Sequence, residues 1–152
     1  TRAHVFSHLD DLKLYEGAKD TVLTLHEQGI KLALVSSSSR KLVEKGLSLY
    51  GLDKYFSSTI SGDDITKHKP DPEAFNQTFQ VIGAAPEETL IIGDAKTDII
   101  VGKATNTITC LFTPEDNRIF YDFDVLHATE PDHIIKSQNE LVDIIHATNQ
   151  QS

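Results

Sequence analysis

Polar side chains that could hold a phosphate and a metal ion follow separate apolar segments of the chain. Ser36 follows the run KLALV and opens a row of serines. Lys69 precedes a proline in a polar loop, and Asp94 and Asp98 lie at and after the end of the run TLIIG. Phosphoryl transfer needs mainly positioning and charge stabilisation, which a hydroxyl, an ammonium group and two carboxylates can supply. These residues therefore predict three of the four parts of a magnesium-dependent phosphoryl-transfer site.

The row of serines could bind an anion. A hydroxyl and the free N–H groups at a helix start together form an anion site. Ser36 and Ser37, with the backbone that follows them, are therefore the candidate phosphate-binding residues. The alternative is that Ser36 is an ordinary N-cap, whose side chain only accepts a hydrogen bond from its own helix. Lys69 is biased toward an extended backbone because proline follows it, and its alternative is a solvated surface lysine.

The two aspartates after TLIIG suit a hard divalent cation. Asp98 comes four residues after Asp94, so one helical turn could return its carboxylate toward Asp94. Two carboxylates at one strand end repel each other unless a cation lies between them, and Mg²⁺ binds one or two carboxylates plus substrate oxygens. The alternative is a pair of acids stabilised by a helix dipole. Asp63 and Asp64 add acid near the same edge, and we interpret them as a solvated loop pair.

Short apolar runs alternate with amphipathic segments along the chain. Runs of this length between helices are typical of strands buried in a parallel sheet. We predict strands at 30–35, 58–60, 90–92, 108–112 and 133–135. We predict helices at 1–9, 18–28, 42–50, 71–82 and 98–104, and a last one that begins in the capping box Ser137-x-x-Glu140. Gly29, Gly51 and Asn106 stand where helices should end.

This alternation predicts an α/β fold, a Rossmann-like core with a mainly parallel sheet and flanking helices. In open parallel sheets, ligands bind beyond the carboxyl ends of the strands. Ser36 and Asp94 both fall at such ends, and the loop that carries Lys69 could reach the same edge. We therefore expect the candidate residues to converge there.

Composition narrows the class of protein and of partner. With 152 residues, 39% of them hydrophobic and 24% charged, the chain fits one ordinary globular domain. The net charge of −9 disfavours nucleic acid and anionic membranes as partners. A lone cysteine, Cys110 in the apolar run ITCLF, predicts a buried thiol and a reducing, cytoplasmic location.

Taken together, these segments resemble the haloacid dehalogenase (HAD) superfamily of hydrolases, close to its phosphoglycolate phosphatase-like branch. The resemblance rests on LYEGAKDTV, LALVSSSSR, GDDITKHKPDPEAF and LIIGDAKTDI, and on ATEPDHIIKSQNEL near the end. It implies a hydrolase core at residues 14–148, the remnant of a helical cap domain at 1–13, and a frayed tail at 149–152.

The resemblance also implies a role for each candidate residue. Ser36 would bind the transferring phosphoryl group, and Lys69 would stabilise the nucleophile and the phosphate. Asp94 would ligate Mg²⁺, and Asp98 would support the metal through water or an outer contact. Dehalogenases of the superfamily have Ser-Asn where this chain has Gly93-Asp94, and phosphoglucomutase-like members have glycine in place of Asp98. The resemblance therefore favours a phosphatase acting on a small phosphorylated metabolite.

The first strand of the family is not found where we expect it. The family's nucleophile lies in an Asp-x-Asp on that strand, whereas a helical pattern precedes Asp10-Asp11 here. We therefore expect a portion of a longer protein, inactive alone, that lacks the first central strand and most of the cap. Its two flanking strands would expose unpaired backbone groups. We expect them to close up, to receive the missing strand, or to exchange strands in a homodimer.

The favoured function is a cytoplasmic, Mg²⁺-dependent phosphomonoesterase that acts through an aspartyl-phosphate. The alternative is a non-catalytic relative that serves as a binding or dimerisation module. A phosphoacceptor receiver domain also combines acids, a hydroxyl and a lysine on an α/β sheet. Such a domain needs its acids on the first strand, whereas Asp94 comes late in this chain.

Overall fold

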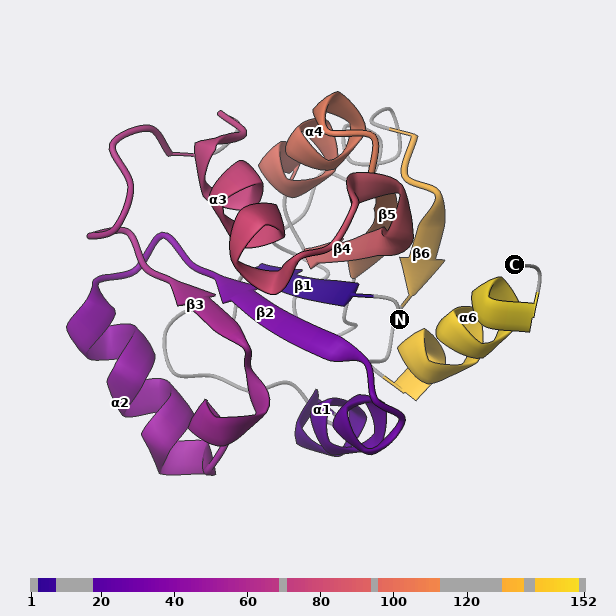
Figure 1. Cartoon of the computed structure of the whole chain (residues 1–152), viewed down its shortest axis with the longest axis horizontal. Helices are drawn as coiled ribbons and strands as arrows, with labels where there is room; N and C mark the ends of the chain where they lie inside the picture. Colours follow the sequence, from indigo (N-terminus) through magenta and orange to yellow (C-terminus); the bar gives the residue numbers. More distant parts are fainter. Residues whose placement is uncertain are drawn as a thin grey trace, which may run out of the picture.

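A six-stranded parallel sheet lies between two layers of helices (Figure 1). The computed structural model describes residues 3–7, 18–68, 71–93, 96–112, 130–135 and 139–150. The strands are β1 (Ala3–Ser7), β2 (Lys31–Val35), β3 (Ser58–Ile60), β4 (Thr89–Gly93), β5 (Ile108–Phe112) and β6 (His133–Ile135). The α-helices are α1 (Ala18–Glu27), α2 (Arg40–Tyr50), α3 (Glu73–Ile82), α4 (Lys96–Ala104) and α6 (Asn139–Gln150). The strand order is β3-β2-β1-β4-β5-β6, so the predicted α/β fold with a parallel sheet is confirmed.

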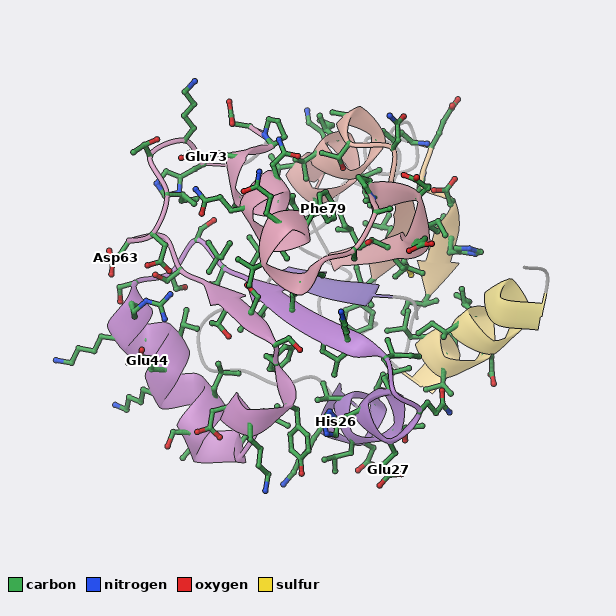
Figure 2. All side chains as sticks on the ribbon, in the orientation of Figure 1. His26, Glu27, Glu44, Asp63, Glu73 and Phe79 are labelled. Atoms are coloured by element: carbon green, nitrogen blue, oxygen red, sulfur yellow. The ribbon has the colours of Figure 1, made fainter. Side chains whose placement is uncertain are left out.

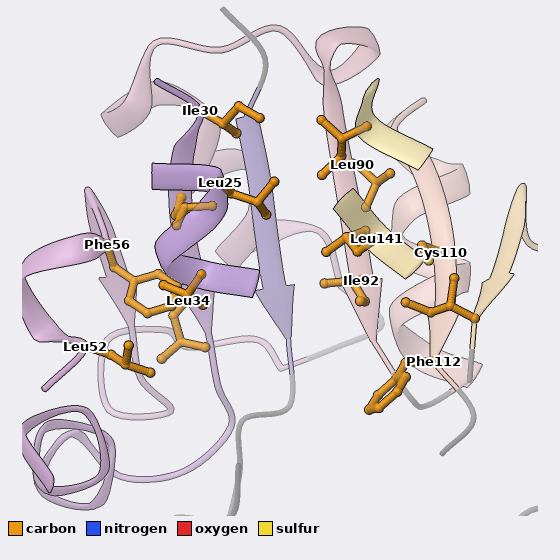
Figure 3. Packing of buried hydrophobic residues seen from close by; sticks show 14 of the residues in the cluster. Leu25, Ile30, Leu34, Leu52, Phe56, Leu90, Ile92, Cys110, Phe112 and Leu141 are labelled. Atoms are coloured by element: carbon orange, nitrogen blue, oxygen red, sulfur yellow. The ribbon is translucent and has the colours of Figure 1, made fainter. Parts of the chain in front are cut away.

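Each face of the sheet carries its own apolar core. On one face, Leu34 and Ile92 pack in a cluster with Leu25 of α1 and Leu141 of α6 (Figure 3). This cluster also buries Cys110, as predicted. Because successive strand residues point to opposite faces, the alternate residues of β2 and β4 form the second core.

The second core joins the sheet to α3 and α4. Val35 and Ile91 pack with Phe75, Phe79 and Val101. The strands are therefore covered on both sides, which explains why β2 and β4 are nearly continuous apolar runs rather than alternating ones.

Residues 3–7 form the central strand of the sheet, where we predicted a helix. β1 lies between β2 and β4 and pairs in parallel with both. The helix predicted for residues 1–9 is therefore wrong, and so is the expectation that the sheet lacks its first central strand. Residues 3–7 likewise belong to the core sheet and not to a cap remnant.

The physical reason for this difference is backbone pairing. β2 and β4 each present a row of N–H and C=O groups to the gap between them, and buried groups of this kind need partners. A short apolar segment such as AHVFS cannot be assigned to helix or strand by periodicity alone. Tertiary pairing therefore decides its conformation, and the sheet receives its central strand from the chain's own N-terminal segment.

Most predicted boundaries agree with the structure to within a residue or two. Gly51 ends α2 in the left-handed conformation, at φ +67°, and Asn106 takes the same conformation after α4, at φ +63°. α3 begins at Glu73, and Asp71 still accepts a hydrogen bond from the Glu73 N–H at 3.0 Å, as an N-terminal capping residue does. α6 reaches Gln150, two residues into the predicted tail. Ser137 of the predicted capping box lies outside the described residues.

In the described part of the chain, no helix combines the length and the hydrophobicity that crossing a membrane requires.

The central position of β1 predicts a large effect of proline at Val5. Proline removes an N–H and fits only edge strands or bulges, so Val5→Pro should lower the free energy of unfolding by about 3 kcal/mol or more. Urea unfolding followed by circular dichroism measures this loss. Val5→Ile, which keeps the N–H and the branched side chain, is the matched control. Equal stability of the two variants would contradict the central placement of β1.

Candidate functional site

Ser36 lies buried at the carboxyl end of β2 and organises the turn that follows it. The residue is only 2% exposed, and its N–H donates to the carbonyl oxygen of Ile60 at 2.9 Å. Its hydroxyl oxygen accepts a hydrogen bond from the Ser38 N–H at 3.1 Å. The N-cap of α2 is Ser39, whose side chain accepts from the Leu42 N–H at 3.3 Å. The N-cap alternative for Ser36 is therefore wrong.

We call residues Ser36–Ser39 the serine turn. It joins the end of β2 to the first residue of α2, and Ser37 within it is exposed. Backbone N–H groups at a helix start favour negative charge because of the helix dipole. The serine turn therefore has the composition and the place in the fold of an anion-binding loop.

Asp98 is fully buried in the first turn of α4, against the end of β4. A Cβ atom added to Gly93 would lie 2.3 Å from Asp98 Oδ2, so the carboxyl group sits directly against the Gly93 backbone. The carboxylate therefore lies at the end of β4, and its predicted return toward Asp94 stays a prediction because Asp94 is outside the described residues. Glycine at position 93 is required because any side chain would collide with the carboxylate.

The structure brings Ser36 and Asp98 to the same edge of the sheet, on either side of β1. Ser7 pairs with Val35, the residue before Ser36, and Phe6 pairs with Ile92, the residue before Gly93. Two strand spacings separate the ends of β2 and β4 by about 10 Å. Ser36 and Asp98 therefore flank the carboxyl end of β1.

Two predicted site residues, Lys69 and Asp94, lie outside the described residues. The loop that precedes Lys69 is hydrogen-bonded to Glu73, the first residue of α3. The Glu73 carboxylate accepts hydrogen bonds from the Lys67 N–H at 2.6 Å and from the N–H and hydroxyl of Thr66 at 3.1 and 3.0 Å. These bonds, led by that from Lys67, lower the pKa of Glu73 below its usual value.

A metal site cannot be completed from the described residues alone. Among the residues that the structure describes, no group of three His, Cys, Asp or Glu side chains could hold a metal ion. The buried Asp98 carboxylate supplies a hard oxygen donor of the kind that Mg²⁺ prefers. The site therefore fits the metal in chemistry, with Asp94 as the expected direct ligand.

The loop after β3, residues Ser61–Asp64, packs against the serine turn, and our sequence analysis missed its importance. Asp64 accepts hydrogen bonds from the Ser61 N–H at 2.7 Å and from both Nε and Nη2 of Arg40. Asp63 accepts from the Arg40 N–H at 2.8 Å. Both residues are exposed, as a solvated loop pair is, but each also accepts hydrogen bonds from Arg40. Their sequence, Ser-Gly-Asp-Asp, is typical of turns that bond to their own backbone, which was the available signal.

The Arg40–Asp64 pair and the buried thiol have shifted pKa values. The hydrogen bond from Arg40 holds the pKa of Asp64 below its usual range, and the same bond raises the pKa of Arg40. Burial raises the pKa of Cys110 to about 12, so the thiol is not a nucleophile at neutral pH. Cys110 is therefore a core residue.

Gly62 predicts a test of how closely the two loops must approach. A Cβ atom at Gly62 would lie 2.3 Å from the carbonyl oxygen of Ser37, which is backbone and cannot rotate away. Gly62→Ala should therefore cost about 1–3 kcal/mol of stability and displace the serine turn. Gly83→Ala is the comparison: Gly83 has open space around it and, unlike Gly62, a positive φ of +66°, so its substitution strains the backbone without a collision. NMR shifts of the Ser36–Ser39 amides should change only in Gly62→Ala; unchanged shifts would contradict the close packing.

The Asp64–Arg40 pair predicts a dependence of stability on pH. Because the pKa of Asp64 is lowered from 3.8 by folding, the unfolded chain binds more protons, and stability is lost as the pH falls below about 4. The two side chains are 39% and 32% exposed, so we expect about 1 kcal/mol or less. The free energies of unfolding of the wild type and of Asp64→Asn, measured with urea, should differ at pH 6. The difference should decrease progressively as the pH falls below about 4. A constant difference over this range would contradict the assignment.

Comparison with known proteins shows the family of the chain. The family model described as haloacid dehalogenase-like hydrolase matches residues 1–112. Pyrophosphatase PpaX of Halalkalibacterium halodurans is 37% identical over 145 residues, which cover 95% of this chain and 66% of that protein. Pyrophosphatase PpaX of Anoxybacillus flavithermus is 37% identical over 151 residues, covering 97% of this chain and 67% of that protein. The chain thus spans about two thirds of the length of these relatives.

Solved structures of the same family share the fold. A predicted phosphoglycolate phosphatase from Haemophilus somnus superposes with a TM-score of 0.78 at 26% identity, over 88% of this chain and 57% of that one. A HAD phosphatase from Thermococcus onnurineus gives 0.73 at 27% identity, over 88% and 58%. Because the family match covers most of the chain and its relatives are more than 30% identical, the protein belongs to the haloacid dehalogenase-like hydrolases, as the sequence resemblance implied.

Proposed function

We propose that the protein is built for Mg²⁺-dependent hydrolysis of a phosphate ester or anhydride. The observation that carries this proposal is the placement of buried Ser36 and buried Asp98 at one edge of the sheet, on either side of β1. In parallel sheets, this edge is where ligands bind. Family membership supports hydrolysis as the class of reaction, and we propose that the reaction takes place at the carboxyl ends of the strands.

Each residue of the edge has a role in this proposal. The Ser36 hydroxyl and the exposed Ser37 would bind the phosphoryl oxygens, and Lys69 would balance their charge. Asp94 would ligate the cation, with Asp98 holding it from its buried position against Gly93. Mg²⁺, when bound, would neutralise charge on the phosphoryl oxygens.

The carboxylate that accepts the phosphoryl group is the missing part. β1 has the sequence AHVFS, and the residues after it are His8, Leu9, Asp10 and Asp11, so an Asp-x-Asp does not follow the strand. Asp122-Phe123-Asp124 has this spacing but lies outside the described residues. We therefore propose that the chain as given binds phosphate without turning it over.

The relatives indicate a substrate class. The curated proteins that match at 33–37% identity carry the name pyrophosphatase, and one similar structure is that of a predicted phosphoglycolate phosphatase. We propose inorganic pyrophosphate or a small phosphate monoester as the substrate of the site. The net charge of −9 makes local cations necessary for either anion.

The composition of the chain supports proposals about its cellular location and its partners. We propose a cytoplasmic protein, since its single thiol forms no internal disulfide. The acidic charge favours neither nucleic acid nor membrane as a partner. A non-catalytic binding or dimerisation module is the second candidate, and the AHVFS sequence of β1 is the observation that favours it.

One substitution tests the proposed function directly. Ser7 pairs with Val35, the residue before Ser36, and His8 is the residue that follows Ser7 in the sequence. His8→Asp creates Asp-Leu-Asp at positions 8–10, the motif that the family has at the end of its first strand. We expect this variant to hydrolyse pyrophosphate or p-nitrophenyl phosphate only with Mg²⁺, measured as phosphate release.

The control is His8→Asn, which has a similar shape but no nucleophilic carboxylate and should be inactive. Adding Ser36→Ala or Asp98→Asn to His8→Asp should lower turnover at least about tenfold, since each removes a charge-stabilising contact. A folded His8→Asp protein without activity, together with a wild type that binds no phosphate analogue, would overturn the proposal in favour of the non-catalytic module.

A further inference from the structure

We propose that Asp64 and Arg40 form a clamp that positions the serine turn for anion binding. This inference rests on the proposed function and assigns a positioning role to a pair outside the predicted site residues. It is carried by the hydrogen bonds of the loop Ser61–Asp64, which lies between β3 and α3.

The loop Ser61–Asp64 contacts the serine turn through backbone atoms. The Gly62 N–H donates to the Ser38 carbonyl oxygen at 2.7 Å, and the Ser36 N–H donates to the Ile60 carbonyl oxygen at 2.9 Å. Gly62 has no space for a Cβ atom against Ser37. A shift of this loop must therefore move the serine turn with it.

Asp64 fixes the shape of the loop. Its Oδ2 accepts from the Ser61 N–H at 2.7 Å and from the Ser61 hydroxyl at 3.0 Å, and its own N–H donates to the Ser61 carbonyl oxygen at 3.1 Å. The same carboxylate binds the Arg40 guanidinium through Nε and Nη2, a two-pronged contact that also fixes orientation. Asp64 therefore joins the loop to the start of α2.

Arg40 closes the clamp from the other side. Its Nη2 also donates to the Thr59 carbonyl oxygen at 3.0 Å, and its N–H donates to Asp63 Oδ2 at 2.8 Å. Figure 2 shows Asp63 at the start of α2 and Glu44 further along the helix. Because Asp63 accepts from the Arg40 N–H, it joins the loop Ser61–Asp64 to the first residue of α2.

The charge of Asp64 and its proposed positioning role predict opposite effects of Asp64→Asn on anion affinity. Asp64→Asn removes a negative charge near an anion site, which alone would tighten anion binding by about twofold or less, since salt screens exposed charges. Loss of the clamp would instead weaken binding. The sign of the change therefore separates a positioning role from a charge effect.

The experiment is isothermal titration of the folded protein with tungstate, a phosphate mimic, in the presence of Mg²⁺ at fixed salt. Asp64→Asn should weaken binding about tenfold relative to the wild type. Glu44→Gln is the matched control: it removes a charge that contacts the same Arg40 guanidinium at 3.4 Å but does not touch the loop. We expect its affinity to stay within about twofold of the wild type.

Arg40→Lys gives a second test that keeps the charge but loses the two-pronged contact. It should also weaken tungstate binding and shift the Ser36–Ser39 amide signals in NMR spectra, even if Asp64→Asn fails to fold. Unchanged or tighter binding by folded Asp64→Asn or Arg40→Lys, with wild-type binding intact, would overturn the clamp alone. A wild type that binds no tungstate would overturn the proposed function, and the clamp with it.

Discussion

The pairing of β1 with both of its neighbours is the constraint on which the rest of the structure depends. β1 sets the spacing between the end of β2, where the serine turn begins, and the end of β4, where Asp98 returns to Gly93. Without a strand between them, β2 and β4 would leave buried backbone groups unpaired. The same pairing that completes the sheet therefore also places the two halves of the proposed phosphate site at a workable distance.

Close backbone approach then fixes the details of the edge. At Gly93 the strand lies directly against a carboxylate, and at Gly62 one loop lies directly against another. Neither position can accept a side chain, so both loops have little freedom to move independently. Hydrogen bonds to Asp64 add orientation to this contact. The proposed anion site thus relies on rigid backbone placement as well as on charge.

The sequence was a good guide wherever local patterns and tertiary packing agree. The strands that end at Val35 and Gly93 could be predicted because they are buried on both faces and read as apolar runs. The helix stops at Gly51 and Asn106 could be predicted from their tolerance of positive φ. The spacing of Asp98 from the end of β4 agrees with the contact between its carboxylate and Gly93.

Prediction failed where distant pairing decides the structure. The segment AHVFS fits either a helix or a strand, and only the gap between β2 and β4 selects the strand. Asp64 and Arg40 are separated by two elements of the fold, so neither residue type nor local spacing reveals their contact. Charged loop residues are usually solvated, and exposure alone does not reveal which of them also bond to a neighbouring loop.

The central claim is that the serine turn and the buried Asp98 form one binding edge. Anomalous diffraction from crystals soaked with Mn²⁺ and tungstate tests it most directly, because both ions can be located by their own signals and Mn²⁺ accepts the oxygen ligands of Mg²⁺. The account predicts tungstate at Ser36 and Ser37, with Mn²⁺ beside it at the end of β4. Ions bound elsewhere, or an edge that stays empty at saturating concentrations, would contradict it.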